Sequence, residues 1–132
     1  MRKPFALLVT ALLITSTAYA ADDIETLPSG VTVQKLNKTS GAQPKASDQV
    51  KVHYRGTLEN GNEFDSSYKR GEPATFPLSR VIPCWTQGVQ KLRVGEKARL
   101  VCPPKTAYGE SGTRGIPPNS TLNFEVELLA IE

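Results

Sequence analysis

The stretch VKVHYRGTL, residues 50–58, decides the fold, because its side chains alternate between apolar and polar. One face carries Val50, Val52 and Tyr54, and the other carries Lys51, His53 and Arg55. A period of two residues predicts a strand with one buried face. The Asn60-Gly61 pair that follows offers a positive φ for a tight turn. The chain is therefore expected to fold back through Glu63 and Phe64.

Two later segments repeat this alternation and indicate an antiparallel sheet. In KARLVC, residues 97–102, the inward positions are Ala98, Leu100 and Cys102. In TLNFEVELLAIE, residues 121–132, they are Leu122, Phe124, Val126 and Leu128. Strands with one apolar and one polar face are typical of antiparallel sheets that face water on one side.

The segment VIPCWTQGVQKLRVGE, residues 81–96, breaks this pattern and predicts a helix. Its apolar positions at helical spacing are Trp85, Gly88, Val89 and Leu92. Pro83 suits the first helical turn, and Gly95 lies just beyond the last. A twisted sheet must cover the apolar face of such a helix. The predicted fold class is therefore α+β, an antiparallel β half-barrel wrapped around one short amphipathic helix.

The first twenty residues have the organisation of a secretory signal peptide. Arg2 and Lys3 precede an apolar stretch over residues 5–14, and a small-x-small cleavage site ends at Ala20. The alternative is a transmembrane anchor, but the stretch falls short of the ~20 apolar residues that span a bilayer. The predicted organisation is a signal peptide at 1–20, a mobile N-terminal leader at 21–29 and one domain at 30–132.

Removal of the signal peptide also changes the net charge of the chain. Without Arg2 and Lys3, the remaining 112 residues carry 14 basic and 13 acidic side chains. This balance argues against nucleic acid or a membrane surface as a partner.

His53 falls on the polar strand face and has no histidine or carboxylate at metal-ligand spacing. We therefore predict no metal and no cofactor.

Two long stretches carry a resemblance to a known family. They are VHYRGTLENGNEFDSSYKRGEPATFPLSRVIPCW, residues 52–85, and GVQKLRVGEKARLVCPPKTAYGESGTRGIPPNSTLNFEVELLAIE, residues 88–132. Their motifs, in this order, resemble the FKBP-type peptidyl-prolyl isomerase domain, and FDSSYKRGEPATF followed by VIP is similar to the bacterial exported branch that includes the macrophage infectivity potentiators. Because the chain offers almost no residues for that branch's dimerisation segment, we expect a monomer.

The resemblance implies an apolar pocket between helix and sheet. Trp85 is expected to form the floor under a substrate prolyl ring, and Tyr108 to donate its hydroxyl to the carbonyl beside the prolyl bond. The backbone N–H of Ile82 is expected to bind a substrate carbonyl further along. The implied catalytic residues are Tyr108, Asp65, Trp85 and Phe124, and the implied substrate-binding residues are Tyr54, Phe64, Arg70, Val81, Ile82 and Ile116.

Asp65 has two interpretations. The resemblance implies a buried carboxylate, held by the Tyr54 hydroxyl and Arg70, that biases substrate orientation without transferring a proton. The local sequence FDSS, taken alone, favours a turn aspartate. Tyr108, in its glycine-rich loop, would similarly be a surface aromatic at a turn. Ala74 stands where many family members carry a phenylalanine at the pocket rim, which puts the affinity for tacrolimus and rapamycin in doubt.

Cys84 and Cys102 are an even pair in a chain expected to be exported, which favours a disulfide. The bridge would tie the helix to the sheet. The alternative is two separate buried thiols, with Cys84 acidified by the helix N-terminus.

Two classes of function remain open. The first is a prolyl isomerase that acts on proline-containing exported polypeptides, in the periplasm if the source is Gram-negative. The second is a binding module or holdase chaperone that uses the same pocket with little turnover. Tacrolimus and rapamycin are further candidate ligands.

Overall fold

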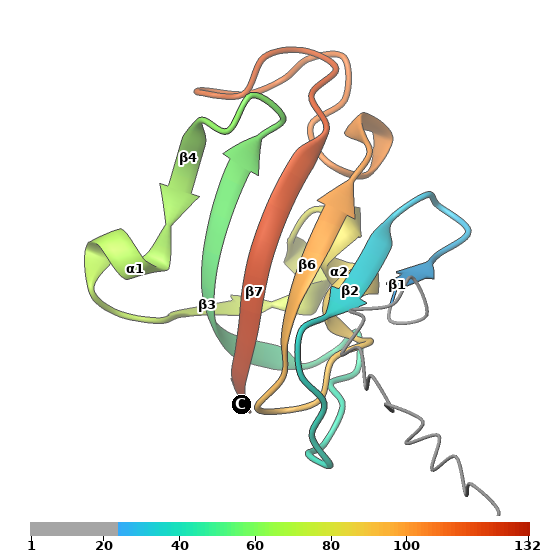
Figure 1. Ribbon diagram of the computed structural model, residues 1–132, viewed down its shortest axis with the longest axis vertical. Helices are drawn as coiled ribbons and strands as arrows, with labels where there is room; N and C mark the ends of the chain where they lie inside the picture. Colours follow the sequence, from blue (N-terminus) through green and yellow to red (C-terminus); the bar gives the residue numbers. More distant parts are fainter. Residues whose placement is uncertain (1–23) are drawn as a thin grey trace, which may run out of the picture.

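The computed structural model describes residues 24–132, and its main element is one seven-stranded antiparallel sheet (Figure 1). The strands are β1 Ile24–Thr26, β2 Thr32–Lys35, β3 Gln49–Leu58, β4 Glu63–Ser66, β5 Ala74–Pro77, β6 Lys97–Cys102 and β7 Leu122–Ile131. Their order across the sheet is β1-β2-β6-β7-β3-β4, and β5 pairs with the first half of β3. The two ten-residue strands β3 and β7 pair along their lengths and form its centre.

The helices are short. They are α1 Ser67–Arg70 and α2 Pro83–Val89, with single 3-10 turns at Leu78–Arg80 and Pro104–Thr106. Helix α2 lies against one face of the sheet (Figure 1). The predicted fold class, an antiparallel sheet around one short helix, is confirmed.

The alternation of apolar and polar residues correctly identified the buried face. Val50 and Val52 are fully buried, and Tyr54 is nearly so. The inward positions of β6 and β7 are likewise buried: Ala98, Leu100, Cys102, Leu122, Phe124, Val126 and Leu128. After β3, Gly61 takes the expected positive φ of 89°, and the chain returns as β4. The core therefore lies between this sheet face and α2.

Helix α2 is shorter than predicted, because it ends at Val89 and does not continue to Leu92. The N–H groups of Lys91 and Leu92 bind carbonyls three residues back, which tightens the final turn. The N–H of Arg93 then donates to the carboxylate of Glu96 at 2.8 Å. Leu92 is nevertheless fully buried. The helical spacing therefore predicted correctly that Leu92 faces the core, but wrongly that it is part of the helix.

The predicted leader also differs from the structure. Residues 24–26 form the edge strand β1, which pairs with β2, and Leu27 is buried. The N–H of Leu27 donates to the carbonyl of Val31 at 2.8 Å across a turn in which Gly30 has a φ of 90°. The predicted signal peptide, 1–20, lies outside the described residues. Among residues 24–132, no helix is long and apolar enough to cross a membrane.

A disulfide between Cys84 and Cys102 joins α2 to β6 in the structure. Both side chains are fully buried, and their Cα atoms are 5.6 Å apart. That separation lies in the middle of the usual range for a disulfide. The bond fixes the start of the helix against the sheet.

Glu96 is a buried charge at the turn that follows α2, with an exposed fraction of only 1%. Its carboxylate accepts the N–H groups of Thr39 at 2.9 Å and Arg93 at 2.8 Å. Lys35 lies 3.0 Å away from the same carboxylate. Burial alone raises the pKa of Glu96, but these partners outweigh it and hold the pKa below its ordinary value.

Glu96→Gln is therefore expected to destabilise the fold by about 1–3 kcal/mol near neutral pH. Because the folded-state pKa is lowered, the stabilisation is complete above the ordinary value of 4.5 and is lost as the pH falls through the folded value. Urea unfolding between pH 7 and pH 3 measures this difference, with exposed Glu110→Gln as the matched control. Parallel stability curves for wild type and Glu96→Gln would contradict the assignment.

Candidate active site

A cavity of about 480 Å³ opens between α2, the inner face of the sheet and two loops. Its lining residues are Tyr54, Phe64, Asp65, Phe76, Arg80, Val81, Ile82, Trp85, Tyr108 and Phe124. The structure thus brings together eight of the ten residues predicted for the site. We call this space the prolyl cavity, after the ring that it was predicted to hold.

Trp85 lies at the base of the prolyl cavity and is 5% exposed. Its ring packs edge to face against three aromatic rings, with centroid distances of 5.1 Å to Tyr54, 5.4 Å to Phe76 and 5.3 Å to Phe124. The indole Nε1 is buried and has no hydrogen-bond partner among the described residues. Three neighbours in the favoured edge-to-face geometry hold the indole in one orientation.

Gly56 on β3 allows the aromatic walls to meet. A Cβ atom at this position would lie 2.5 Å from the ring of Phe64 and 2.8 Å from the ring of Phe124. Phe64 and Phe124 pack edge to face at 5.5 Å directly over the glycine. Any side chain at residue 56 would displace both walls of the prolyl cavity.

Three polar groups form a closed network at the rim. The Tyr54 hydroxyl donates to Asp65 Oδ2 at 2.5 Å, and Arg70 donates to Asp65 Oδ1 at 2.6 Å and to the Tyr54 hydroxyl at 2.8 Å. Helix α1 places Arg70 here, since Ser66 caps its first turn and Gly71 ends it with a φ of 74°. The segment FDSSYKRG thus builds the network locally.

The network determines the charge states of its members. Burial raises the pKa of Tyr54, and the hydrogen bond to Asp65 raises it further. Desolvation alone would raise the pKa of Asp65, but the hydrogen bonds from Tyr54 and Arg70 lower it overall. The hydrogen bond to Tyr54 and the neighbouring Asp65 raise the pKa of Arg70. Asp65 is therefore an ionised acceptor at neutral pH, without a proton to transfer.

Asp65 is not the buried carboxylate that was expected, because its side chain is 41% exposed. It lies at the mouth of the prolyl cavity, where β4 ends and one oxygen can face water. The turn interpretation of FDSS is wrong, because Asp65 lies within β4, although its Oδ1 also accepts the N–H of the next residue, Ser66, at 2.9 Å. Both local and long-range partners hold the carboxylate.

Tyr108 reaches the prolyl cavity from the loop between β6 and β7, which extends past the end of the sheet where β7 begins (Figure 1). The side chain is 41% exposed, and its hydroxyl has no partner within residues 24–132. The loop is held by a bond from Asn119 N–H to the Gly109 carbonyl at 2.8 Å and by the buried side chain of Ile116. The loop thus supports an unbound hydroxyl at the mouth.

Two predicted residues do not line the prolyl cavity. Ile116 was expected to contact substrate but is 6% exposed, because the short turn between Thr113 and Ile116 directs it into the core. Arg70 contacts the site only through Asp65 and Tyr54. Ala74 is also absent from the lining.

Phe76 and Arg80 line the prolyl cavity and were not predicted from sequence. Phe76 pairs with Val50 across β5 and β3, and its ring contacts Tyr54 at 5.7 Å. Its alternation with Ala74 in the segment ATFP was the available signal. Arg80 had no such signal, because its position depends on the 3-10 turn that leads into α2.

The backbone around Ile82 offers a donor beside the indole. The carbonyl of Ile82 accepts the N–H groups of Trp85 at 2.9 Å and Thr86 at 3.2 Å, while its own N–H donates to no backbone carbonyl of the described chain. Pro83 begins α2 directly after it. The N–H of Ile82 is therefore available to a ligand carbonyl.

His53 makes two local contacts on the outer side of β3. Its Nδ1 lies 2.9 Å from the Ser67 hydroxyl, and its ring stacks on Tyr68 at 4.7 Å. No cluster of three potential metal ligands occurs in the described part of the chain. His53 belongs to the outer side of β3, away from Tyr54.

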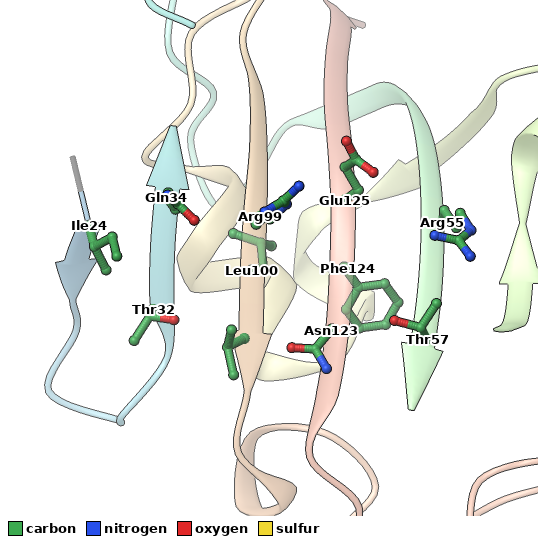
Figure 2. A pocket seen from close by; sticks show the side chains of 11 residues that line it. Ile24, Thr32, Gln34, Arg55, Thr57, Arg99, Leu100, Asn123, Phe124 and Glu125 are labelled. Carbon is green, nitrogen blue, oxygen red and sulfur yellow. The ribbon is translucent and has the colours of Figure 1, made fainter. Parts of the chain in front are cut away.

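A second hollow, of about 360 Å³, lies on the outer side of the sheet (Figure 2). Arg99 and Arg55 flank Glu125 on neighbouring strands, and Lys97 lies 3.3 Å from Glu125. Arg55 pairs with Glu63, Lys97 pairs with Glu125, and the lining of this hollow lacks the group of aromatic rings that surrounds Trp85. The prolyl cavity is therefore the better candidate site.

Comparisons with known proteins agree with this geometry. The family described as FKBP-type peptidyl-prolyl cis-trans isomerase matches residues 40–129. The FKBP-type peptidyl-prolyl cis-trans isomerase FkpA of Aeromonas hydrophila is 55% identical over 111 residues, which cover 84% of this chain and 41% of that protein. FK506-binding protein 1 of Rhizopus delemar is 51% identical over 106 residues, which cover 77% of this chain and 98% of that protein.

The crystal structure of FkpA from Escherichia coli has a TM-score of 0.81 at 50% identity, covering 84% of this chain and 52% of that one. The chain therefore spans about two fifths of the length of its FkpA relative in Aeromonas and almost the whole fungal relative. Sequence, fold and cavity agree, and the chain belongs to the family of FKBP-type peptidyl-prolyl cis-trans isomerases.

Proposed function

We propose that this chain catalyses the cis-trans isomerisation of X-Pro bonds in polypeptides. The observation that carries the proposal is the prolyl cavity itself, with Trp85 at its base and an unpartnered Tyr108 hydroxyl at its mouth. An apolar, aromatic space of this kind suits a prolyl ring. The two polar donors, Tyr108 and the N–H of Ile82, suit the carbonyls of a bound peptide.

The chemistry requires no bond to be made or broken. Resonance holds the peptide bond planar behind a barrier of ~18–20 kcal/mol, and X-Pro bonds interconvert over tens to hundreds of seconds. Resonance is lost in the twisted transition state, so the carbonyl oxygen carries less charge than in the planar state. A water-poor cavity binds this less polar form better, which lowers the barrier.

Each residue has a distinct role in this mechanism. Trp85, Phe124, Phe64, Phe76 and Val81 enclose the prolyl ring. Tyr108 donates to the carbonyl beside the twisting bond, and the N–H of Ile82 holds a carbonyl further along. Tyr54 and Arg70 keep Asp65 ionised at the rim, where its charge orients the peptide. The buried side chain of Ile116 anchors the loop that carries Tyr108.

We also infer that the chain is exported through the signal peptide at residues 1–20 and acts in the periplasm on proline-containing polypeptides, with tacrolimus and rapamycin as further ligands of the prolyl cavity. The Cys84–Cys102 disulfide suits an oxidising compartment.

We infer a monomer, since the described residues expose only Ile24, Tyr68 and Tyr108 as large apolar side chains. Sedimentation that gives a stable dimer would overturn this inference.

The alternative is a binding module or holdase, because the same cavity could hold a proline peptide without turnover. Refolding of a protein whose slow phase is limited by prolyl isomerisation distinguishes the two. An isomerase present at a few per cent of the substrate accelerates the slow phase. A holdase at that ratio leaves the rate unchanged, which would contradict the proposal.

Tyr108→Phe is expected to lower kcat/KM about three- to tenfold, because one hydrogen bond to the substrate is lost. Stability should not change, since the hydroxyl has no partner in the folded chain. Tyr68→Phe is the matched control, because Tyr68 is 45% exposed and lies outside the prolyl cavity. Equal losses in both variants, or none in either, would remove Tyr108 from the mechanism.

A further inference from the structure

Arg80 is a cation in the wall of a largely aromatic and aliphatic cavity. Its side chain is exposed, and it forms no ion pair within residues 24–132. The lining contains one other ionised side chain, Asp65, which is already bound by Arg70 at 2.6 Å. The charge at the mouth that lacks a partner is therefore positive.

The backbone that carries Arg80 is held firmly. Leu78, at the start of the same 3-10 turn, is fully buried, and its N–H donates to the carbonyl of Asp48 at 3.0 Å. Its carbonyl accepts the Thr86 hydroxyl at 2.6 Å, which ties the turn to α2. Arg80 thus projects from a backbone that these hydrogen bonds hold in place.

Arg80 lies two residues before Ile82, whose N–H is the proposed donor to a substrate carbonyl beyond the proline. In that proposed binding mode, the residues that follow the proline lie nearest the guanidinium. A glutamate there would meet an unpaired cation, whereas a lysine would meet repulsion. A guanidinium can bind a carboxylate through two parallel hydrogen bonds.

We propose that Arg80 gives this isomerase a preference for substrates with an acidic residue directly after proline. The proposal rests on the proposed function and deepens it by naming a substrate class. Because the pair would be exposed, the preference is modest: about two- to fivefold for glutamate over glutamine. Salt should reduce it, because exposed charges are screened.

The test compares two capped peptides, acetyl-Ala-Leu-Pro-Glu-amide and acetyl-Ala-Leu-Pro-Gln-amide, which differ in one charge. The Kd and kcat/KM of each are measured for wild type, Arg80→Gln and Arg80→Glu. Wild type should favour the glutamate peptide in both quantities. The glutamate-to-glutamine ratio should fall to one in Arg80→Gln and below one in Arg80→Glu.

Arg99→Gln is the matched control, since it removes the same charge from the outer side of the sheet (Figure 2). An equal loss of preference in Arg99→Gln would assign the effect to net charge and overturn the role of Arg80. A glutamate-to-glutamine ratio of one in wild type would overturn it also. If wild type accelerates exchange of neither peptide, the proposed function fails, while the Kd ratio still tests Arg80.

Discussion

Trp85→Ala is expected to reduce kcat/KM for a proline peptide by about 10- to 100-fold. The indole forms the base of the prolyl cavity, and its loss removes apolar contact worth about 1.5–3 kcal/mol to a bound ring. The three aromatic rings that pack around it would also lose their common partner. The measurement is the rate of peptide isomerisation at several enzyme concentrations.

The same substitution is expected to cost about 3–5 kcal/mol of stability, so the loss of activity has to be distinguished from unfolding. Trp85→Phe is therefore the second variant, because it keeps an aromatic base and fills most of the space. It should fold and retain most of the activity. Circular dichroism of each variant establishes that the folded protein is being assayed. A folded Trp85→Ala protein with wild-type activity would contradict the role of the indole.

Removing the disulfide is expected to lower the free energy of unfolding by about 3 kcal/mol, because the bond closes a loop with a sequence separation of 18 residues. The double variant Cys84→Ala, Cys102→Ala tests this by urea unfolding. Alanine is chosen because both positions are fully buried and a hydroxyl there would lack a partner. The bond joins the first turn of α2 to β6, so activity should become more sensitive to temperature.

Reduction of the wild type provides the control, since it breaks the same bond without changing the sequence. Thiol counting in denatured, unreduced protein obtained from the exporting cell should give no free thiol. Two free thiols would favour the alternative of separate buried cysteines. Identical unfolding curves for oxidised wild type, reduced wild type and the double variant would show that the bond has no effect on stability.

The features that the sequence predicted well are those with a regular period. The inward positions of β3, β6 and β7 follow from alternation alone, and each is buried. Trp85 was placed on the inner side of a helix by its spacing to Val89.

The features that were missed depend on contacts between distant parts of the chain. The end of α2 depends on Glu96 capturing the Arg93 N–H, and Glu96 itself is held by Thr39, 57 residues away. The edge strand β1 was missed for a different reason, because all three of its residues are exposed and show no alternation. Arg80 lines the prolyl cavity because the 3-10 turn that carries it is held by hydrogen bonds to Thr86 and Asp48. No local pattern reports such partners.

The exposure of Asp65 and the burial of Ile116 were also not predictable from local sequence. The resemblance to the family implied Tyr54 and Arg70 as the partners of Asp65, and both hydrogen bonds are present. The burial of Ile116 depends on how the loop between β6 and β7 packs, which neither composition nor spacing encodes.

The most direct test of the isomerase proposal is NMR exchange between the cis and trans forms of a short Leu-Pro peptide. The cis and trans signals report binding and exchange in one sample. With the chain at a small fraction of the peptide concentration, we expect exchange cross-peaks on a timescale where the free peptide shows none. Peptide shifts that reveal binding, with exchange still at the uncatalysed rate, would contradict the isomerase and leave a binding module.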